Sequence, residues 1–204
     1  MIRIVDCGLG NIQAFRNVFK RLNIAALTAT TAAELEDATK VILPGVGHFD
    51  RAMERLTQSG MRGKLEELVL AKGVPVLGVC VGMQIMTQSS DEGMLPGLGW
   101  IEGHVRGFAA LELARVLPVP HMGWNDVRPV AANRLFSQLE TAAQFYFLHS
   151  FYVECAQDDD IMAISHYGKD FSSAVRRGNV FGVQFHPEKS HHFGTRLLQN
   201  FAEL

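Results

Sequence analysis

Apolar residues in the first half of the chain alternate between short continuous runs and helical stripes. The short runs, bounded by glycine, proline or polar residues, are typical of buried strands; they lie at residues 2–5, 25–27, 41–43 and 74–79. The stripes, with apolar residues three or four apart, predict helices; they lie at residues 11–22, 34–38, 49–57, 63–71 and 82–88. This alternation favours right-handed crossovers and a parallel sheet that helices cover on both faces.

From about residue 100 to residue 182 short β-rich segments replace the helical stripes. They lie at residues 116–119, 144–148, 151–155, 161–166 and 180–183. We expect antiparallel strands appended to the same sheet, or a small second sheet. The acidic run at residues 158–160 predicts a solvated turn, and residues 194–204 predict a closing amphipathic helix. Without a linker-like stretch, residues 1–204 are expected to form a single domain.

Composition narrows the class of protein. Hydrophobic residues make up 48% of the 204 residues and charged residues 20%, the balance of a globular protein. A net charge of −2 argues against nucleic acid or an anionic membrane as the main partner. The three cysteines do not suggest a disulfide framework, and no apolar run approaches the ~20 residues of a membrane helix. With no signal-peptide pattern at the start, we expect a cytoplasmic protein.

The most informative stretch is Pro-Val-Leu-Gly-Val-Cys-Val-Gly-Met-Gln at residues 75–84. An apolar strand runs into Gly-x-Cys-x-Gly and a helical pattern follows, the layout of a nucleophile elbow with Cys80 in place of serine. A helix start favours thiolate, and the N–H of Val81 would face an oxyanion. The elbow alone leaves an inert, buried cysteine open, which is the reading we favour for Cys7 and Cys155.

A histidine and a carboxylate follow an apolar strand more than a hundred residues later, as His186 and Glu188. A cysteine nucleophile needs a base, and the base needs a group that holds its orientation. His-x-Glu by itself also fits a solvated loop, but together with the elbow it predicts a Cys-His-Glu triad. The spacing of His186, His191 and His192 does not match the usual zinc patterns, so no metal and no cofactor are expected.

A glycine-rich loop follows the buried strand at residues 41–43, with the sequence Pro-Gly-Val-Gly-His-Phe at residues 44–49. Such a loop presents N–H groups freely. Gly47 is therefore a candidate for the second oxyanion donor, although a plain strand-to-helix turn explains the same residues.

These motifs together resemble class I, triad-type glutamine amidotransferases over essentially the whole chain. Within that family the chain looks like the glutaminase subunits of imidazole glycerol phosphate synthases, which serve histidine biosynthesis. The elbow and His-Pro-Glu are common to the family. More specific strings are Pro-His-Met-Gly-Trp-Asn at residues 120–125 and Phe-His-Pro-Glu-Lys-Ser at residues 185–190. The resemblance implies an α/β fold: a flavodoxin-like, mostly parallel central sheet with helices on both faces and appended antiparallel strands.

The resemblance also implies roles for individual residues. Cys80 would be the nucleophile, His186 the base and acid, and Glu188 its orienting group, with Gly47 and Val81 framing the oxyanion hole. The glutamine main-chain groups would be held by Gln84, Glu92, His149 and Ser150. The mouth facing a (β/α)₈-barrel synthase partner would be lined by Asn11, Trp124, Tyr146 and Lys189. Ammonia would pass into that barrel, and activity would stay low until the synthase binds its own ligand.

Three alternatives differ in chemistry or in acceptor. A related subunit could feed ammonia to another synthetase, for example in bacterial surface-sugar assembly. A cysteine peptidase of similar fold need not carry the Pro-His-Met-Gly-Trp-Asn string, and a non-catalytic binding subunit would be expected to have lost part of the triad. The chain departs from the family pattern at Cys7 and at residues 108–117, which bears on the partner more than on the chemistry.

Overall fold

The centre of the molecule is a run of five parallel strands. A computed structural model describes residues 1–110, 117–139 and 143–204. In spatial order the strands are β2 (Ala26–Ala29), β1 (Ile2–Val5), β3 (Lys40–Gly45), β4 (Val76–Cys80) and β13 (Val180–Val183). The parallel sheet predicted from the alternating pattern is therefore confirmed. Its fifth strand comes from the far end of the chain.

An antiparallel extension continues the sheet beyond β13. It consists of β12 (Asp170–Arg177), β10 (Phe151–Cys155), β6 (Gly103–Gly107) and the two-residue β5 (Ser89–Ser90), which pairs parallel to β6. β11 (Ile161–His166) pairs with β12, and β8 (Arg128–Pro129) pairs with β11.

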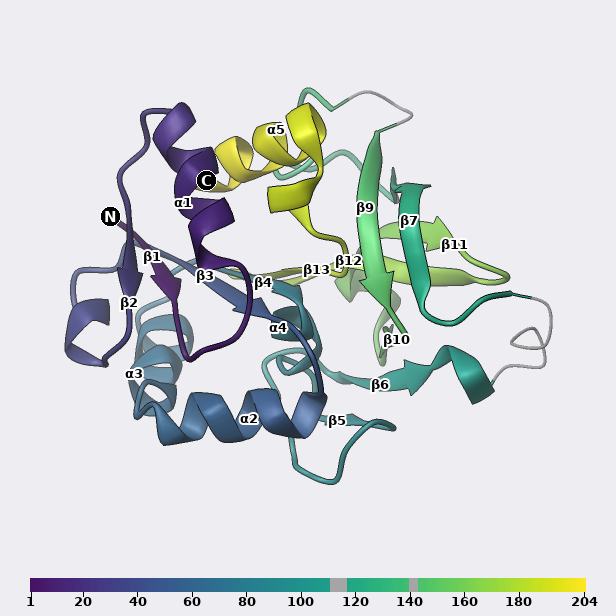
Figure 1. Cartoon of the computed structure of the whole chain (residues 1–204), viewed down its shortest axis with the longest axis horizontal. Helices are drawn as coiled ribbons and strands as arrows, with labels where there is room; N and C mark the ends of the chain where they lie inside the picture. The colour runs from purple at the N-terminus through teal and green to yellow at the C-terminus, as the bar shows by residue number, and fades with distance from the viewer. Residues whose placement is uncertain (111–116, 140–142) are drawn as a thin grey trace.

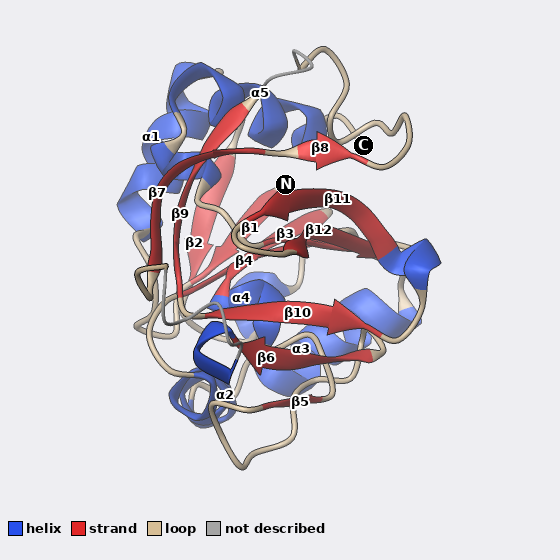
Figure 2. Cartoon of the chain, turned by 90° about the vertical axis from the view of Figure 1, so that its right-hand side faces the viewer, coloured by secondary structure: helices blue, strands red, loops and turns tan. Residues whose placement is uncertain are grey.

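A separate two-stranded ribbon joins β7 (His121–Asp126) to β9 (Gln144–His149). Figure 2 shows β7 beside β9 and leading on into β8, so one segment crosses from the ribbon to the large sheet. The sequence left open whether the later strands extend the first sheet or form a second one. Both arrangements occur, but residues 180–183, expected among these later strands, instead form β13 and pair parallel with β4.

Helices cover both faces of the parallel strands. Figure 1 shows α1 (Ile12–Arg21) and α5 (His191–Ala202) on one side, and α2 (Phe49–Gln58) and α3 (Arg62–Glu66) on the other. α3 runs on into a π-helical turn, η2 (Glu67–Ala71). Each helix buries its apolar stripe, as Phe15 and Phe19 of α1 and Leu56 of α2 do. None of the helices in the described ranges is long and apolar enough to cross a membrane.

Two predicted helices are shorter than expected. The segment at residues 34–38 is only a 3₁₀ turn, η1 (Ala33–Leu35), because its N–H groups bond three residues back, Leu35 to Ala32 and Glu36 to Ala33. The helix expected at residues 82–88 is α4 (Val81–Gln84). It ends early because the N–H groups of Met86 and Thr87 bond only three residues back, to Met83 and Gln84, and the chain then turns into β5. The Thr87 hydroxyl also donates to the Gln84 carbonyl, at 2.8 Å.

Three further expectations need correction. α5 begins at His191 rather than Gly194. Gly194 lies inside the helix, where the absence of a side chain lets the helix pack on Pro187. A Cβ on Gly194 would lie 1.8 Å from the Pro187 carbonyl oxygen. Residues 117–119 form no strand, and the rest of that predicted segment, Val116, lies outside the described residues. The acidic run is a 3₁₀ turn, η5 (Asp158–Asp160), whose Asp160 is buried and ion-paired with Arg177.

Candidate active site

The nucleophile candidate lies at a sharp bend between β4 and α4. Cys80 has φ +55° and ψ −114°, a conformation that L-residues rarely adopt. Such a residue costs about 1–3 kcal/mol and persists because the surrounding structure holds it. Here β4 is paired on both sides, with β3 and β13. The thiol therefore projects from a rigid strand end.

Glycines at the bend let the backbones of β3 and α4 touch. A Cβ on Gly82 would lie 1.9 Å from the Leu43 carbonyl oxygen, and one on Gly45 would lie 2.4 Å from the Gly82 nitrogen. A Cβ on Gly78 would come within 2.7 Å of the Gly82 carbonyl oxygen. No side chain fits at these positions, which explains the Gly-x-Cys-x-Gly spacing.

His186 reaches the thiol because β13 lies beside β4 and parallel to it. The carboxyl ends of parallel neighbours meet at one edge of a sheet, so Cys80 and the segment after Val183 emerge together. The backbone N–H of His186 donates to the Tyr146 carbonyl at 2.8 Å, which fixes the segment against β9. The triad partners thus come from two strands that are adjacent in space and distant in sequence.

The imidazole is held by a buried carboxylate. His186 Nδ1 lies 2.9 Å from Glu188 Oε1, with side chains 4% and 2% exposed. Burial alone would lower the pKa of His186, but hydrogen bonds to Cys80 and Glu188 outweigh it and raise the pKa to about 9. Nδ1 is then the donor to Glu188, and Nε2 is left to face the sulfur.

A buried amide completes the surroundings of the sulfur. Gln184 Nε2 lies 3.7 Å from Cys80 Sγ, and Gln184 Oε1 accepts a hydrogen bond from Gln84 at 3.1 Å. Leu148 contributes its carbonyl oxygen, 3.9 Å from Sγ. Gln184 was not singled out from the sequence. The sequence contains a signal, since Gln184 is a polar residue inside an apolar run. The structure shows that its side chain is fully buried.

The sulfur opens into a cavity of about 290 Å³. The cavity brings together all predicted oxyanion and substrate residues and one predicted interface residue; besides Cys80 and His186 these are Gly47, Val81, Gln84, Glu92, His149, Ser150 and Lys189. The residues that sequence reasoning missed are Val46, Pro120, Leu148 and Phe151. Glu188 lies behind His186 and does not line the cavity.

Two of the predicted substrate residues are fixed by the protein itself. Gln84 Nε2 donates to the Phe151 carbonyl at 3.1 Å. One oxygen of Glu92 accepts a hydrogen bond from the N–H of Phe49, at the start of α2, at 2.8 Å. Both side chains are therefore held in place at the cavity wall.

The side chain of His149 is fully engaged inside the protein. Its Nδ1 lies 2.8 Å from the Phe151 carbonyl and its Nε2 lies 2.8 Å from His121 Nδ1, while His121 Nε2 meets the amide of Asn125 at 3.2 Å. Burial lowers the pKa of His149 to about 3 and that of His121 to about 4, so both rings are neutral. With both nitrogens used, His149 can offer a ligand only its backbone and ring surface.

The remaining predicted interface residues lie outside the cavity. Trp124 stacks on His191 with 5.2 Å between ring centroids and meets Tyr146 edge-on at 6.2 Å. The ammonium of Lys189 lies 5.6 Å from the Tyr146 ring centroid. Asn11 caps α1 by accepting the N–H of Ala14 at 3.1 Å.

Comparison with known proteins agrees with this geometry. A family model described as glutamine amidotransferase class-I matches residues 3–204. The chain belongs to the class-I glutamine amidotransferase family. It is 60% identical over 204 residues to a Bdellovibrio bacteriovorus protein and 52% identical to one from Leptospira interrogans, with full coverage of all chains. Both are named "Imidazole glycerol phosphate synthase subunit HisH".

A solved structure titled "Crystal structure of glutamine amidotransferase" has the same fold. It superposes with a TM-score of 0.77 at 20% identity, covering 100% of this chain and 98% of the other. The fold expected from the resemblance is thereby confirmed for this class-I amidotransferase.

The other two cysteines of this amidotransferase carry no comparable surroundings. Burial raises the pKa of the Cys155 thiol to about 11 and also raises that of Cys7. Among the residues that the structure describes, no three or more His, Cys, Asp and Glu side chains gather to hold a metal.

The dipole of α4, expected from the sequence to favour the Cys80 thiolate, contributes little to its stabilisation. α4 has only four residues and so aligns few peptide dipoles. The imidazolium of His186 is the stronger local positive charge.

Proposed function

We propose that this chain is a single glutaminase domain, the subunit of a cytoplasmic imidazole glycerol phosphate synthase that hydrolyses glutamine to glutamate and ammonia. The observation that carries the proposal is the meeting of Cys80 with a buried His186–Glu188 pair at the wall of a cavity. Glutaminase chemistry needs a thiolate, a proton donor and an oxyanion site in one place.

The reaction proceeds in two stages. The thiolate of Cys80 attacks the side-chain amide carbon of glutamine, and the oxyanion that forms faces the N–H groups of Val81 and Gly47. His186, held by Glu188, protonates the departing nitrogen, which leaves as ammonia. Water that has lost a proton to the same imidazole then cleaves the γ-glutamyl thioester and frees glutamate.

The substrate's main-chain groups bind at the opposite end of the cavity. The carboxylate of Glu92 attracts the α-ammonium group. Gln84 can meet that group only with its Oε1, because both hydrogens of its Nε2 are used by the Phe151 carbonyl and Gln184 Oε1. The 149–150 backbone meets the α-carboxylate end. The cavity of about 290 Å³ is at the small end of ligand pockets, which suits a single amino acid.

The full-length relatives support a proposal for the pathway and the partner. A subunit so similar to them would pass ammonia to a (β/α)₈-barrel synthase that forms imidazole glycerol phosphate and AICAR in histidine biosynthesis. Exposed apolar side chains near the cavity support docking. Val46 (41% exposed) lines the cavity, and Met122 (65%) and Trp124 (45%) lie on β7, where Met122 pairs with the cavity residue Leu148. Asn11, Tyr146 and Lys189 would lie in the same interface.

The experiment has a chemical arm and a partner arm. Cys80→Ala, purified with the barrel synthase of the same organism, should release no glutamate yet keep the wild-type circular dichroism spectrum, while Cys155→Ala should behave as wild type. Wild-type turnover by Cys80→Ala would refute the nucleophile. Failure of the wild-type chain to co-purify with the barrel synthase, or its full activity without one, would refute the partner assignment.

A further inference from the structure

The residue proposed to bind the glutamine ammonium group, Glu92, follows β5, one of the two-residue strands of the large sheet. β5 has two residues and pairs with β6 at Ser89↔His104 and Ser90↔Val105. Backbone bonds flank this pairing, from Gln88 N–H to the Gly103 carbonyl at 3.2 Å and from Asp91 N–H to the Val105 carbonyl at 2.8 Å. A two-residue edge strand is a weak anchor for a substrate-binding carboxylate.

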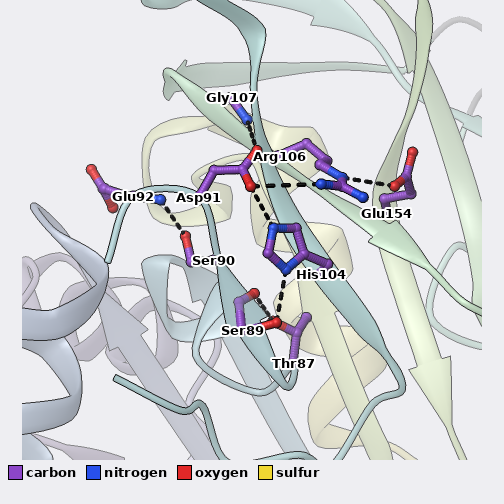
Figure 3. A network of polar contacts seen from close by, with 9 residues as sticks. All are labelled: Thr87, Ser89, Ser90, Asp91, Glu92, His104, Arg106, Gly107 and Glu154. Atoms are coloured by element: carbon purple, nitrogen blue, oxygen red, sulfur yellow. Dashed lines mark hydrogen bonds and ion pairs between the residues drawn. The ribbon is translucent and has the colours of Figure 1, made fainter. Parts of the chain in front are cut away.

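A histidine on β6 reinforces this edge. Figure 3 shows His104 between Ser89 and Asp91, with one ring nitrogen toward each. Nδ1 lies 2.7 Å from the Ser89 hydroxyl and Nε2 lies 2.6 Å from Asp91 Oδ1. The ring thus bridges two residues of the same segment, which fixes the backbone around Ser90.

Asp91 is tied to the sheet at further points. Its Oδ2 accepts the N–H of Gly107 at 3.3 Å, and Arg106 lies 3.6 Å from its Oδ1 while pairing with Glu154 of β10 at 2.9 Å. The hydrogen bond to His104, aided by those neighbours, holds the pKa of Asp91 below its usual range. The carboxylate therefore stays charged and bound to the ring.

On the other side of the strand the same segment leads into the cavity. The hydroxyl of Ser90, which is buried, accepts the N–H of Glu92 at 3.0 Å. Glu92 then reaches the cavity wall, where the Phe49 N–H binds its Oε2. His104 thus holds Ser89 and Asp91, and these two residues fix the backbone of Ser90 between them. The Ser90 hydroxyl in turn holds the backbone of Glu92, whose carboxylate lies at the cavity wall.

We propose that His104 is a positioning residue that, by bridging Ser89 and Asp91, fixes the Glu92 carboxylate where it recognises the α-ammonium group of glutamine. The inference rests on the proposed glutaminase function. Although Ser89, His104 and Asp91 repeat the residue types of a serine hydrolase triad, they lie outside the cavity that holds Cys80. Their role is to hold a carboxylate that binds substrate.

The test compares glutamine with 4-carbamoylbutanoate, which has the same reacting amide but no α-amino group. A charge-assisted hydrogen bond discriminates by about 10- to 100-fold. His104→Ala should raise KM for glutamine about tenfold with little change in kcat and lower the preference for glutamine over 4-carbamoylbutanoate by the same factor. His104→Gln, whose amide replaces Nε2 toward Asp91, should recover most of that preference.

The matched control is His166→Ala. His166 also pairs with an aspartate, at 2.8 Å from Asp170 Oδ1, but it is exposed and does not line the Cys80 cavity. It should leave the preference unchanged. If His104→Ala misfolds, Asp91→Asn removes the charge at the same size and should lower the preference alike.

The outcomes separate the two proposals. An unchanged preference in both His104→Ala and Asp91→Asn, together with a lost preference in Glu92→Gln, would overturn the positioning role alone. An unchanged preference in Glu92→Gln would overturn the recognition of the ammonium group by Glu92, and the positioning role with it. Glutamate release by Cys80→Ala would instead refute the proposed function.

Discussion

Replacing Glu188 by glutamine tests how the buried pair contributes to catalysis. The substitution keeps the size of the side chain and removes its charge. At 2.9 Å and an effective dielectric constant of ~20, the gross attraction between Glu188 and a protonated His186 is about 6 kcal/mol. Because His186 is already protonated in the resting pair, most of this attraction is present both before and during the reaction. Only the difference between the two states changes kcat.

The expected loss is therefore set by orientation and proton transfer. A glutamine carbonyl can still accept from Nδ1–H, but its NH₂ group then takes the place of Glu188 Oε2, which has no hydrogen-bond partner among the described residues. An unsatisfied buried donor costs about 1–3 kcal/mol, which favours a flipped amide that holds the imidazole wrongly. We expect kcat for glutamate release to fall about 10²–10³-fold, within the range of general acid–base catalysis, with little change in KM.

The pH profile supplies an independent measurement. Activity needs the proton on His186, so it falls as the pH rises through the pKa of that group. Since Glu188 helps to raise this pKa to about 9, Glu188→Gln should move the alkaline limb of kcat to lower pH. Glutamate release followed from pH 6 to 10 in the complex with the synthase measures both effects. The control is Glu66→Gln, which lies in a half-buried pair with Arg62 on α3. A wild-type rate with an unmoved alkaline limb would refute the reasoning.

Three further results are expected. Gly82→Ala should destabilise the protein by more than about 3 kcal/mol in urea unfolding, because its Cβ meets the β3 backbone. Gly63→Ala, whose Cβ meets nothing within 4 Å, should stabilise α3 by about 0.5–1 kcal/mol. Equal urea midpoints for the two variants would contradict the packing of Gly82 against β3. His121→Ala should cost about 2–4 kcal/mol in the same measurement, from the cavity and the unpaired His149 nitrogen, and the exposed His166→Ala close to nothing. Iodoacetamide at pH 8 should label Cys80 before Cys155 in peptide mass mapping, because burial keeps the Cys155 thiol protonated, and glutamine should slow the Cys80 reaction; preferential labelling of Cys155 would overturn this.

The parallel sheet, and the residues proposed as a triad, could be singled out from the sequence because local patterns carry them. The apolar runs at β3, β4 and β13 end where the chemistry begins, so Gly47, Cys80 and His186 could be placed at strand ends before their contact was known. The glycines of the bend are similarly local, since their spacing follows from how close two backbones must come.

Other parts of the site depend on which strands pair and in what register. His121 and His149 face each other only because β7 and β9 pair with those two residues directly opposite, which neither segment reveals alone. Gln184 and Gln84, a hundred positions apart, meet inside the core. Short helices were also overestimated, as at residues 82–88, since the apolar spacing does not show where the backbone bonds change to three-residue spacing and end α4.

The position of β13 also governs when this enzyme can begin to work. During synthesis the thiol segment emerges first, while the strand that fills the middle of the sheet and delivers the imidazole is made a hundred residues later. Until that strand inserts between β4 and β12, a growing chain has a cysteine with no base and a sheet with an open gap. On the proposed mechanism, a chain that ends before β13 therefore produces no ammonia.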